Sequence, residues 1–220
     1  MCPFLLTSLS YDFLHTKKLT PSGDVLGILS VLVALSECSF HSCPPEIPIS
    51  VTHKLQAPFS CSQIQPCFVP GENCEEQIVQ QIAKAKRLIL VQAYSFTSKP
   101  IVTALLAAHQ RCVKVQVILD KSQLRQRYSQ LAVLHKHHIP VWMDMKPKIA
   151  HSKVMVIDGA VVITGSFNFS KSAQIANAEN LLVIHDATSA QQYTRNWEQR
   201  REQSQPLESV LAISAFSGSD

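Results

Sequence analysis

The stretch HSKVMVIDGAVVITGSFN, from His151 to Asn168, contains the pattern that decides the fold. Two apolar runs, 153–157 and 160–164, each have the length and the branched side chains of a buried strand. The pair Asp158-Gly159 joins them and is typical of a turn. We therefore predict two strands that meet at a turn, with polar residues before the first strand and after the second.

Helices and strands are predicted to alternate on both sides of this stretch. Asn73, with Glu76 three residues later, forms a capping box that begins a helix, and Ser98, with Pro100 in the first turn, begins a second helix. This alternation predicts an α/β layered domain with a central mixed, largely parallel sheet flanked by helices. The predicted strands are 88–94, 113–119, 139–143, 153–157, 160–164 and 180–185, and the predicted helices are 73–87, one from Ser98, 124–134 and a closing helix marked by Ala190, Tyr193 and Trp197.

The N-terminal third differs in composition from the rest of the chain. Lys17 and Lys18 precede an apolar run, Val25–Leu35, and small residues follow, which is the order of a secretory signal. A buried N-terminal helix is the alternative. We predict a signal peptide over 1–36, an irregular Pro/Ser/Cys-rich linker over 37–70, one catalytic domain over 71–205 and a flexible tail over 206–220. The product would be exported, either periplasmic or secreted, with tethering to a membrane by the N-terminal segment left open.

The cysteines fit an exported protein. Removal of 1–36 would take away Cys2 and leave six cysteines, an even number that predicts disulfides without fixing their pairing. No C-x-x-C pair is present, and the histidines 135, 137 and 138 lie at the polar end of a predicted helix, so a zinc site is not favoured. We expect no metal and no cofactor.

The polar residues around the two strands suit chemistry on a phosphate. His151 and Lys153 alternate, so both can reach one phosphate: a neutral imidazole is a competent nucleophile, and an ammonium stabilises charge on phosphoryl oxygens. Ser166 and Asn168 have the same spacing and supply neutral donors, after Gly165, whose missing side chain lets the backbone approach the phosphate. No cluster of Asp and Glu suited to Mg²⁺ accompanies them.

These residues fit H-x-K-x4-D-x6-G-S-x-N at every fixed position, which resembles the phospholipase D superfamily. The similarity covers roughly 72–200 and is greatest to small exported bacterial endonucleases of that superfamily. It implies that His151 forms a covalent phosphohistidine and that an acidic residue before the next strand, Glu179 here, orients the imidazole. Surface salt-bridging is the alternative for Glu179. The turn pattern predicts that Asp158 is a structural residue, and the resemblance implies the same.

One copy of the motif supplies one histidine, whereas cleavage also needs a proton donor for the leaving oxygen. Longer superfamily members contain two copies, and the short ones resemble half an enzyme. We therefore expect a homodimer with a shared active site, in which one His151 attacks and its copy protonates. If the donor instead lies within the chain, the alternatives are His185 or one of the three histidines at 135, 137 and 138.

The substrate class stays open at this point. A net charge of +4 and a pI near 8.7 suit a polyanion but do not select one. The first hypothesis is a non-specific endonuclease acting on DNA, with RNA as a further substrate, because phosphate contacts contain no sequence information. A phospholipase D that hydrolyses head-group diesters is the alternative. A catalytically inactive protein that binds nucleic acid or a membrane surface is the third hypothesis.

Overall fold

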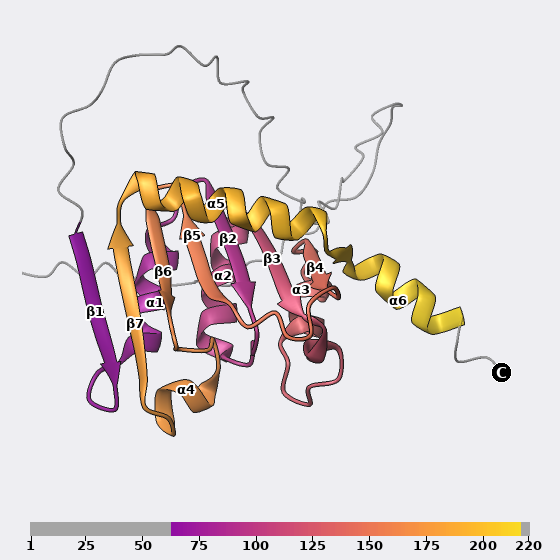
Figure 1. Ribbon diagram of the computed structural model, residues 1–220, viewed down its shortest axis with the longest axis horizontal. Helices are drawn as coiled ribbons and strands as arrows, with labels where there is room; N and C mark the ends of the chain where they lie inside the picture. Colours follow the sequence, from indigo (N-terminus) through magenta and orange to yellow (C-terminus); the bar gives the residue numbers. More distant parts are fainter. Residues whose placement is uncertain (1–62, 217–220) are drawn as a thin grey trace, which may run out of the picture. The chain divides into compact units, whose positions relative to one another are not determined.

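A computed structural model describes residues 63–216, which form one eight-stranded sheet with helices on both faces (Figure 1). The strand order is β1-β7-β6-β5-β2-β3-β4-β8. The strands are β1 (Gln63–Val69), β2 (Leu88–Ala93), β3 (Lys114–Asp120), β4 (Val141–Asp144), β5 (Lys153–Ile157), β6 (Val161–Gly165), β7 (Glu179–His185) and β8 (Gln205–Pro206).

The α/β class and the mixed sheet are confirmed. Only β2, β3 and β4 run parallel to one another, and the other neighbouring strands pair antiparallel, so the parallel part is smaller than predicted. The predicted strand pair around Asp158-Gly159 is the antiparallel hairpin β5–β6, in which Val154 faces Thr164 and Ile157 faces Val161.

Alternation along the strands explains why both faces of the sheet are covered. In β5, Val154 and Val156 belong to one apolar cluster, whereas Met155 and Ile157 belong to another. The first cluster lies beneath α5 (Ala187–Glu202), whose Trp197 donates a 2.9 Å hydrogen bond to the carbonyl of Val91 in β2. The second cluster lies beneath α1 (Cys74–Lys84), α2 (Lys99–Gln110) and α3 (Leu131–Lys136). Figure 1 shows α5 on the near side of the sheet and α1 and α2 behind it.

The predicted helix starts are confirmed. The Asn73 side chain accepts a hydrogen bond from the backbone N–H of Glu76, and the Ser98 hydroxyl accepts one from that of Ile101. The helix predicted over 124–134 is wrong. The chain there forms a short 3₁₀ helix, η1 (Lys121–Leu124), then a turn, and then α3, because the Gln123 side chain turns inward and accepts a 3.2 Å hydrogen bond from the N–H of Phe96.

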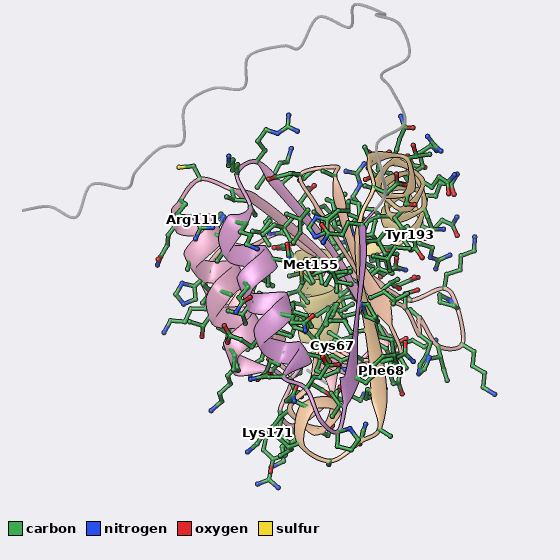
Figure 2. All side chains as sticks on the ribbon, turned by 90° about the vertical axis from the view of Figure 1, so that its left-hand side faces the viewer. Cys67, Phe68, Arg111, Met155, Lys171 and Tyr193 are labelled. Carbon is green, nitrogen blue, oxygen red and sulfur yellow. A yellow bond between two sulfur atoms is a disulfide. The ribbon has the colours of Figure 1, made fainter. Side chains whose placement is uncertain are left out.

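Two predicted boundaries also need correction. The irregular linker predicted over 37–70 includes β1, a complete edge strand that pairs with β7 over seven residues. The alternating pattern of β1 was hidden by Pro66 and by exposed apolar residues such as Phe68, which faces outward in Figure 2. The flexible tail predicted over 206–220 includes α6 (Leu207–Phe216), which buries Leu207 and Val210 against the domain.

A disulfide joins Cys67 of β1 to Cys74 of α1 (Figure 2). Cys112 forms no disulfide with any described residue and is exposed. The predicted signal peptide and most of the predicted linker lie outside the described residues. Within 63–216 no helix has both the length and the apolar character that crossing a bilayer requires.

Candidate active site

Both basic residues of the motif lie at one edge of the sheet, where β5 begins. Lys153 is the first residue of β5 and pairs with Ala93, the last residue of β2. The N–H of Tyr94 donates to the carbonyl of Ser152 at 3.0 Å, which continues the pairing toward His151. The His151 side chain is exposed, as a nucleophile must be, and its ring centroid lies 4.6 Å from that of Tyr94.

Lys153 is a buried cation, with 6% of its surface exposed. Its ammonium donates a 2.6 Å hydrogen bond to the backbone carbonyl of His151 and lies 5.2 Å from the centroid of the Tyr94 ring. Burial lowers the pKa of Lys153 below 10.5, and the negative charge of Glu179 acts in the opposite direction. The ammonium of Lys153 is thus fixed to the backbone of His151, and both side chains lie near the Tyr94 ring.

Glu179 lies at the same edge but has different partners from those predicted. Its carboxylate accepts a 2.5 Å hydrogen bond from the Ser166 hydroxyl and a 2.8 Å bond from the Asn177 amide. None of the hydrogen bonds of the described residues joins Glu179 to the His151 imidazole. Glu179 acts on Lys153 through its charge, so it belongs to the electrostatic environment of the site in this arrangement.

Ser166 also differs from the prediction. A hydroxyl has one hydrogen to donate, and here it goes to Glu179. The Ser166 oxygen accepts from the backbone N–H of Asn180 at 3.0 Å and from the Asn180 side chain at 3.3 Å. Ser166 therefore links β6 to the start of β7 and would have to exchange a partner to contact a phosphate.

Gly165 is required by the neighbouring strand. A Cβ placed on Gly165 would lie 2.4 Å from the backbone oxygen of Asn180, which also accepts hydrogen bonds from the N–H groups of Ser166 and Phe167. The close approach within the protein accounts for this glycine, and its predicted role in letting the backbone approach a phosphate stays a prediction.

Asn168 has an acceptor without a partner at this edge, whereas the predicted contact with a phosphate would use its amide N–H₂ group as the donor. Its Oδ1 atom is buried and has no hydrogen-bond partner among the described residues. A buried polar atom without a partner is rare, since it loses solvation without compensation. The flanking Phe167 and Phe169 are fully buried, as expected, so they fix the backbone that presents the Asn168 amide.

Asp158 is structural, as predicted. It adopts φ 54° in the β5–β6 turn, and its carboxylate accepts hydrogen bonds from the N–H groups of Lys86, Arg87 and Leu88 at 2.8–2.9 Å. Burial acts to raise its pKa, but these three donors and the Arg87 charge outweigh burial and hold the pKa below its ordinary value. The turn is at the opposite end of β5 from His151.

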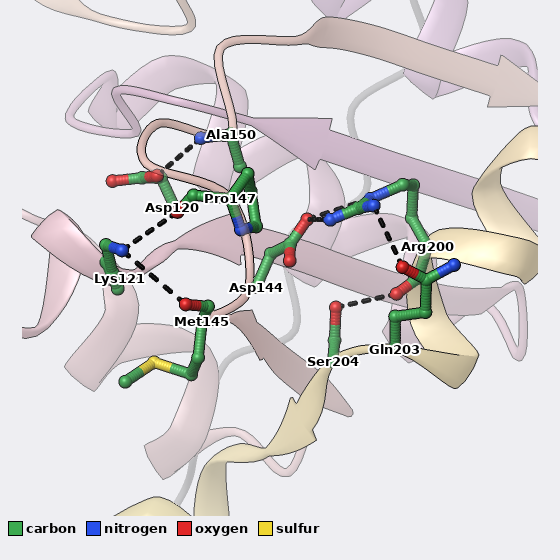
Figure 3. A network of polar contacts seen from close by, with 9 residues as sticks. All are labelled: Asp120, Lys121, Asp144, Met145, Pro147, Ala150, Arg200, Gln203 and Ser204. Carbon is green, nitrogen blue, oxygen red and sulfur yellow. Dashed lines mark hydrogen bonds and ion pairs between the residues drawn. The ribbon is translucent and has the colours of Figure 1, made fainter.

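Residues 145–150, which lead into His151, are held by two residues that sequence reasoning missed (Figure 3). Buried Asp120 accepts a 2.7 Å hydrogen bond from the N–H of Ala150, the residue before His151. Lys121 donates to the carbonyl of Pro147 at 2.8 Å. The available signal was Asp120 directly after the apolar run 117–119, because a charge there must find partners.

The alternative proton donors lie away from this edge. His185 is the last residue of β7 and Glu179 is its first, so they are about 20 Å apart along an extended strand. His135, His137 and His138 lie at the end of α3 and after it, and His135 is 4.0 Å from Glu208 of α6. Among residues 63–216, no hydrogen bond, ion pair or ring contact joins a second histidine to His151.

A metal site was also considered from the donor groups. In the part of the chain that the structure describes, no group of three or more His, Cys, Asp and Glu side chains is arranged to hold a metal ion.

Comparison with known proteins identifies the family of the chain. Residues 78–201 match the family model described as the cardiolipin synthase, PLD-like domain. The chain is 46% identical to a phospholipase D of Rickettsia prowazekii over 142 residues, which are 64% of this chain and 69% of that protein. It is 31% identical to human mitochondrial cardiolipin hydrolase over 61% of this chain and 55% of that one.

Solved structures show the same fold. Nuc, a phospholipase D family member from Salmonella typhimurium, superposes with a TM-score of 0.63 at 33% identity, over 66% of this chain and 97% of that one. NucT from Helicobacter pylori gives a TM-score of 0.61 at 25% identity, over 66% and 99%. A single motif with its histidine and lysine at one sheet edge, a matching family model and these relatives lead to one conclusion: the chain belongs to the phospholipase D superfamily and is a phosphodiesterase of that family.

Proposed function

We propose that this phosphodiesterase is a non-specific endonuclease that hydrolyses DNA, and also RNA, through a covalent phosphohistidine on His151. The observation that supports the mechanism most directly is the fixed pair at the start of β5. Lys153 is buried and its ammonium donates to the backbone carbonyl of His151, so a positive charge is held at the residue whose imidazole remains exposed.

In the proposed reaction, a neutral ring nitrogen of His151 attacks phosphorus, and the bond from phosphorus to the leaving oxygen breaks as that oxygen takes a proton. Lys153 and the Asn168 amide stabilise the charge on the phosphoryl oxygens. Water then attacks the phosphohistidine and loses a proton to the group that had donated one, so the second step releases a phosphomonoester and restores His151.

The proton donor is proposed to be His151 of a second copy of this chain. The structure describes no second histidine near His151, while a two-fold axis at this edge would bring the two copies of an exposed residue together. The proposed partner is thus a second copy of the chain, in a homodimer with a shared active site. An exported product is proposed for the same protein, and the Cys67–Cys74 disulfide supports an oxidising compartment.

A phospholipase D acting on lipid head-group diesters is the second candidate. The names of the relatives favour it, since the Rickettsia proteins are phospholipases D and the human protein is a cardiolipin hydrolase. The proposed chemistry at phosphorus is the same for both substrates. The nuclease is favoured because the sequence resembles the small exported endonucleases of the superfamily.

The test is to incubate the purified full chain with supercoiled plasmid DNA and, separately, with labelled phosphatidylcholine and cardiolipin vesicles, all in millimolar EDTA. We expect nicking of the plasmid and a phosphorylated, acid-labile His151 in quenched samples. Cleavage of lipid without cleavage of DNA would select the phospholipase. Loss of all activity in EDTA that Mg²⁺ restores would contradict the phosphohistidine route.

A further inference from the structure

A cavity of about 450 Å³ lies at the ends of β2, β3 and β4, close to the segment that leads into His151. Tyr94 lines the cavity, and its ring also packs on His151, so the cavity and the nucleophile share one wall. Ile149, two residues before His151, forms another part of the wall and is 50% exposed. His151 itself does not line the cavity, so Tyr94 and Ile149 are the residues that connect this space to the nucleophile.

The charged residues of the cavity are mostly cations. Lys121, Arg125 and Lys148 line it, and the one acidic residue is Asp120. Asp120 is 3% exposed, and its two carboxylate oxygens accept from the N–H groups of Ser122 and Ala150. Its charge is thus turned into the protein, and the surface that a ligand meets is positive.

Two of these cations differ from the third in having no bonding partner among the described residues. Lys121 is bonded to the carbonyl of Pro147 and holds the backbone that leads to His151 (Figure 3). By contrast, Arg125 and Lys148 are exposed, and neither side chain has a hydrogen bond or an ion pair with any described residue. Two unpaired cations over a partly apolar wall suit a phosphate with a sugar or base attached.

We propose that this cavity is a subsite for a second phosphate of a polynucleotide strand, adjacent to the phosphate that His151 attacks, and that Arg125 and Lys148 bind it. The inference rests on the proposed nuclease. Every link of a strand has a phosphate, so a cationic subsite beside the nucleophile recognises a polynucleotide without reading its sequence. In the shared-site dimer, symmetry places one such cavity on each side of the scissile phosphate.

The experiment measures binding rather than turnover, so that it stands apart from the test of the activity. The full chain with His151→Ala is titrated with fluorescent oligothymidylates that contain one phosphate or several. In this background, added phosphates should raise the affinity. Arg125→Gln and Lys148→Gln should each remove most of that gain, about tenfold for one charge-assisted contact. The slope of log affinity against log salt should fall by about 0.7 for each lost contact on a single strand.

The matched control is Arg195→Gln, which makes the same change in charge at an exposed position on α5, outside the cavity. This control variant should keep the full gain in affinity that the added phosphates give. The proposed subsite is contradicted if Arg125→Gln and Lys148→Gln also keep this gain in affinity, or if Arg195→Gln loses as much of it. It is equally wrong if these two variants weaken binding to cardiolipin vesicles and not to oligonucleotides. A failure of the nuclease itself would appear separately, as loss of plasmid cleavage by the wild-type chain with oligonucleotide binding intact.

Discussion

The two ends of the β5–β6 hairpin make different use of one short motif. At the turn, the Asp158 carboxylate is saturated by three backbone donors from the segment that leads into β2. At the open end, the His151 imidazole is exposed, and none of the hydrogen bonds of the described residues involves its ring nitrogens. A charged group whose bonds are all made to backbone supports the architecture, while polar groups with unused capacity can act on a substrate.

The largest effect should come from the open end. His151→Ala removes the nucleophile and, in a shared site, the acid as well, so we expect turnover to fall by at least about 10⁴-fold. The circular dichroism spectrum and the sizing profile should not change, because the ring is exposed. A variant that keeps wild-type turnover would place the nucleophile elsewhere.

Mixing subunits extends this prediction to the dimer. When wild-type and His151→Ala chains are unfolded and refolded together in equal amounts, about a quarter of the dimers are wholly wild type. Activity should then fall to about a quarter of an all-wild-type control under the shared-site proposal. Retention of about a half, or an active monomer on a sizing column, would show that each chain works alone.

Lys153→Met should come next. It removes the cation beside the nucleophile, and we expect kcat/KM to fall by about 10²- to 10³-fold. Stability should change little or rise, because methionine fills similar space without a buried charge. Thermal unfolding and kinetics measured on one preparation test both parts. A large drop in melting temperature would show that Lys153 is a structural residue like Asp158.

The reciprocal change is Asp158→Asn, which should destabilise the fold and leave catalysis at low temperature largely intact. Weakening charged hydrogen bonds at the turn should lower the free energy of unfolding by about 1–3 kcal/mol. The folded-state pKa of Asp158 is lowered, so its stabilisation is present above 3.8 and is lost as pH falls through the folded-state value. The difference in free energy of unfolding between wild type and variant, measured by urea denaturation, should therefore become smaller in acid. A gap that stays constant with pH would contradict this assignment.

The smallest expected effect concerns Glu179 and pH. The pKa of Lys153 lies below 10.5, so the alkaline loss of kcat/KM should begin at a lower pH than for an exposed lysine. Glu179 raises that pKa by its charge, and Glu179→Gln should move the alkaline limb to still lower pH. If only the acid limb moves, Glu179 acts on the imidazole, as the sequence resemblance implies.

The contrast between the two ends also explains what could be predicted from sequence. The turn at Asp158-Gly159 and the N-caps Asn73 and Ser98 are local features, and all were predicted correctly. The hydrogen-bond partners of Ser166 and Glu179 depend on the register between β6 and β7, which local sequence patterns do not reveal. In the same way, Asp120 acts on a segment about thirty residues away. β1 was missed because an edge strand with Pro66 and exposed apolar residues lacks the usual alternation.

The bond between Cys67 and Cys74 has a practical consequence for making the protein. β1 closes the edge of the sheet, and only four residues separate it from α1. In the reducing cytosol of an expression host the disulfide would not persist, so only main-chain pairing and packing would hold β1 against β7. Strands that lose their outer neighbour are templates for aggregation. Production in an oxidising compartment, or with an oxidative refolding step, is therefore the sound route to soluble enzyme.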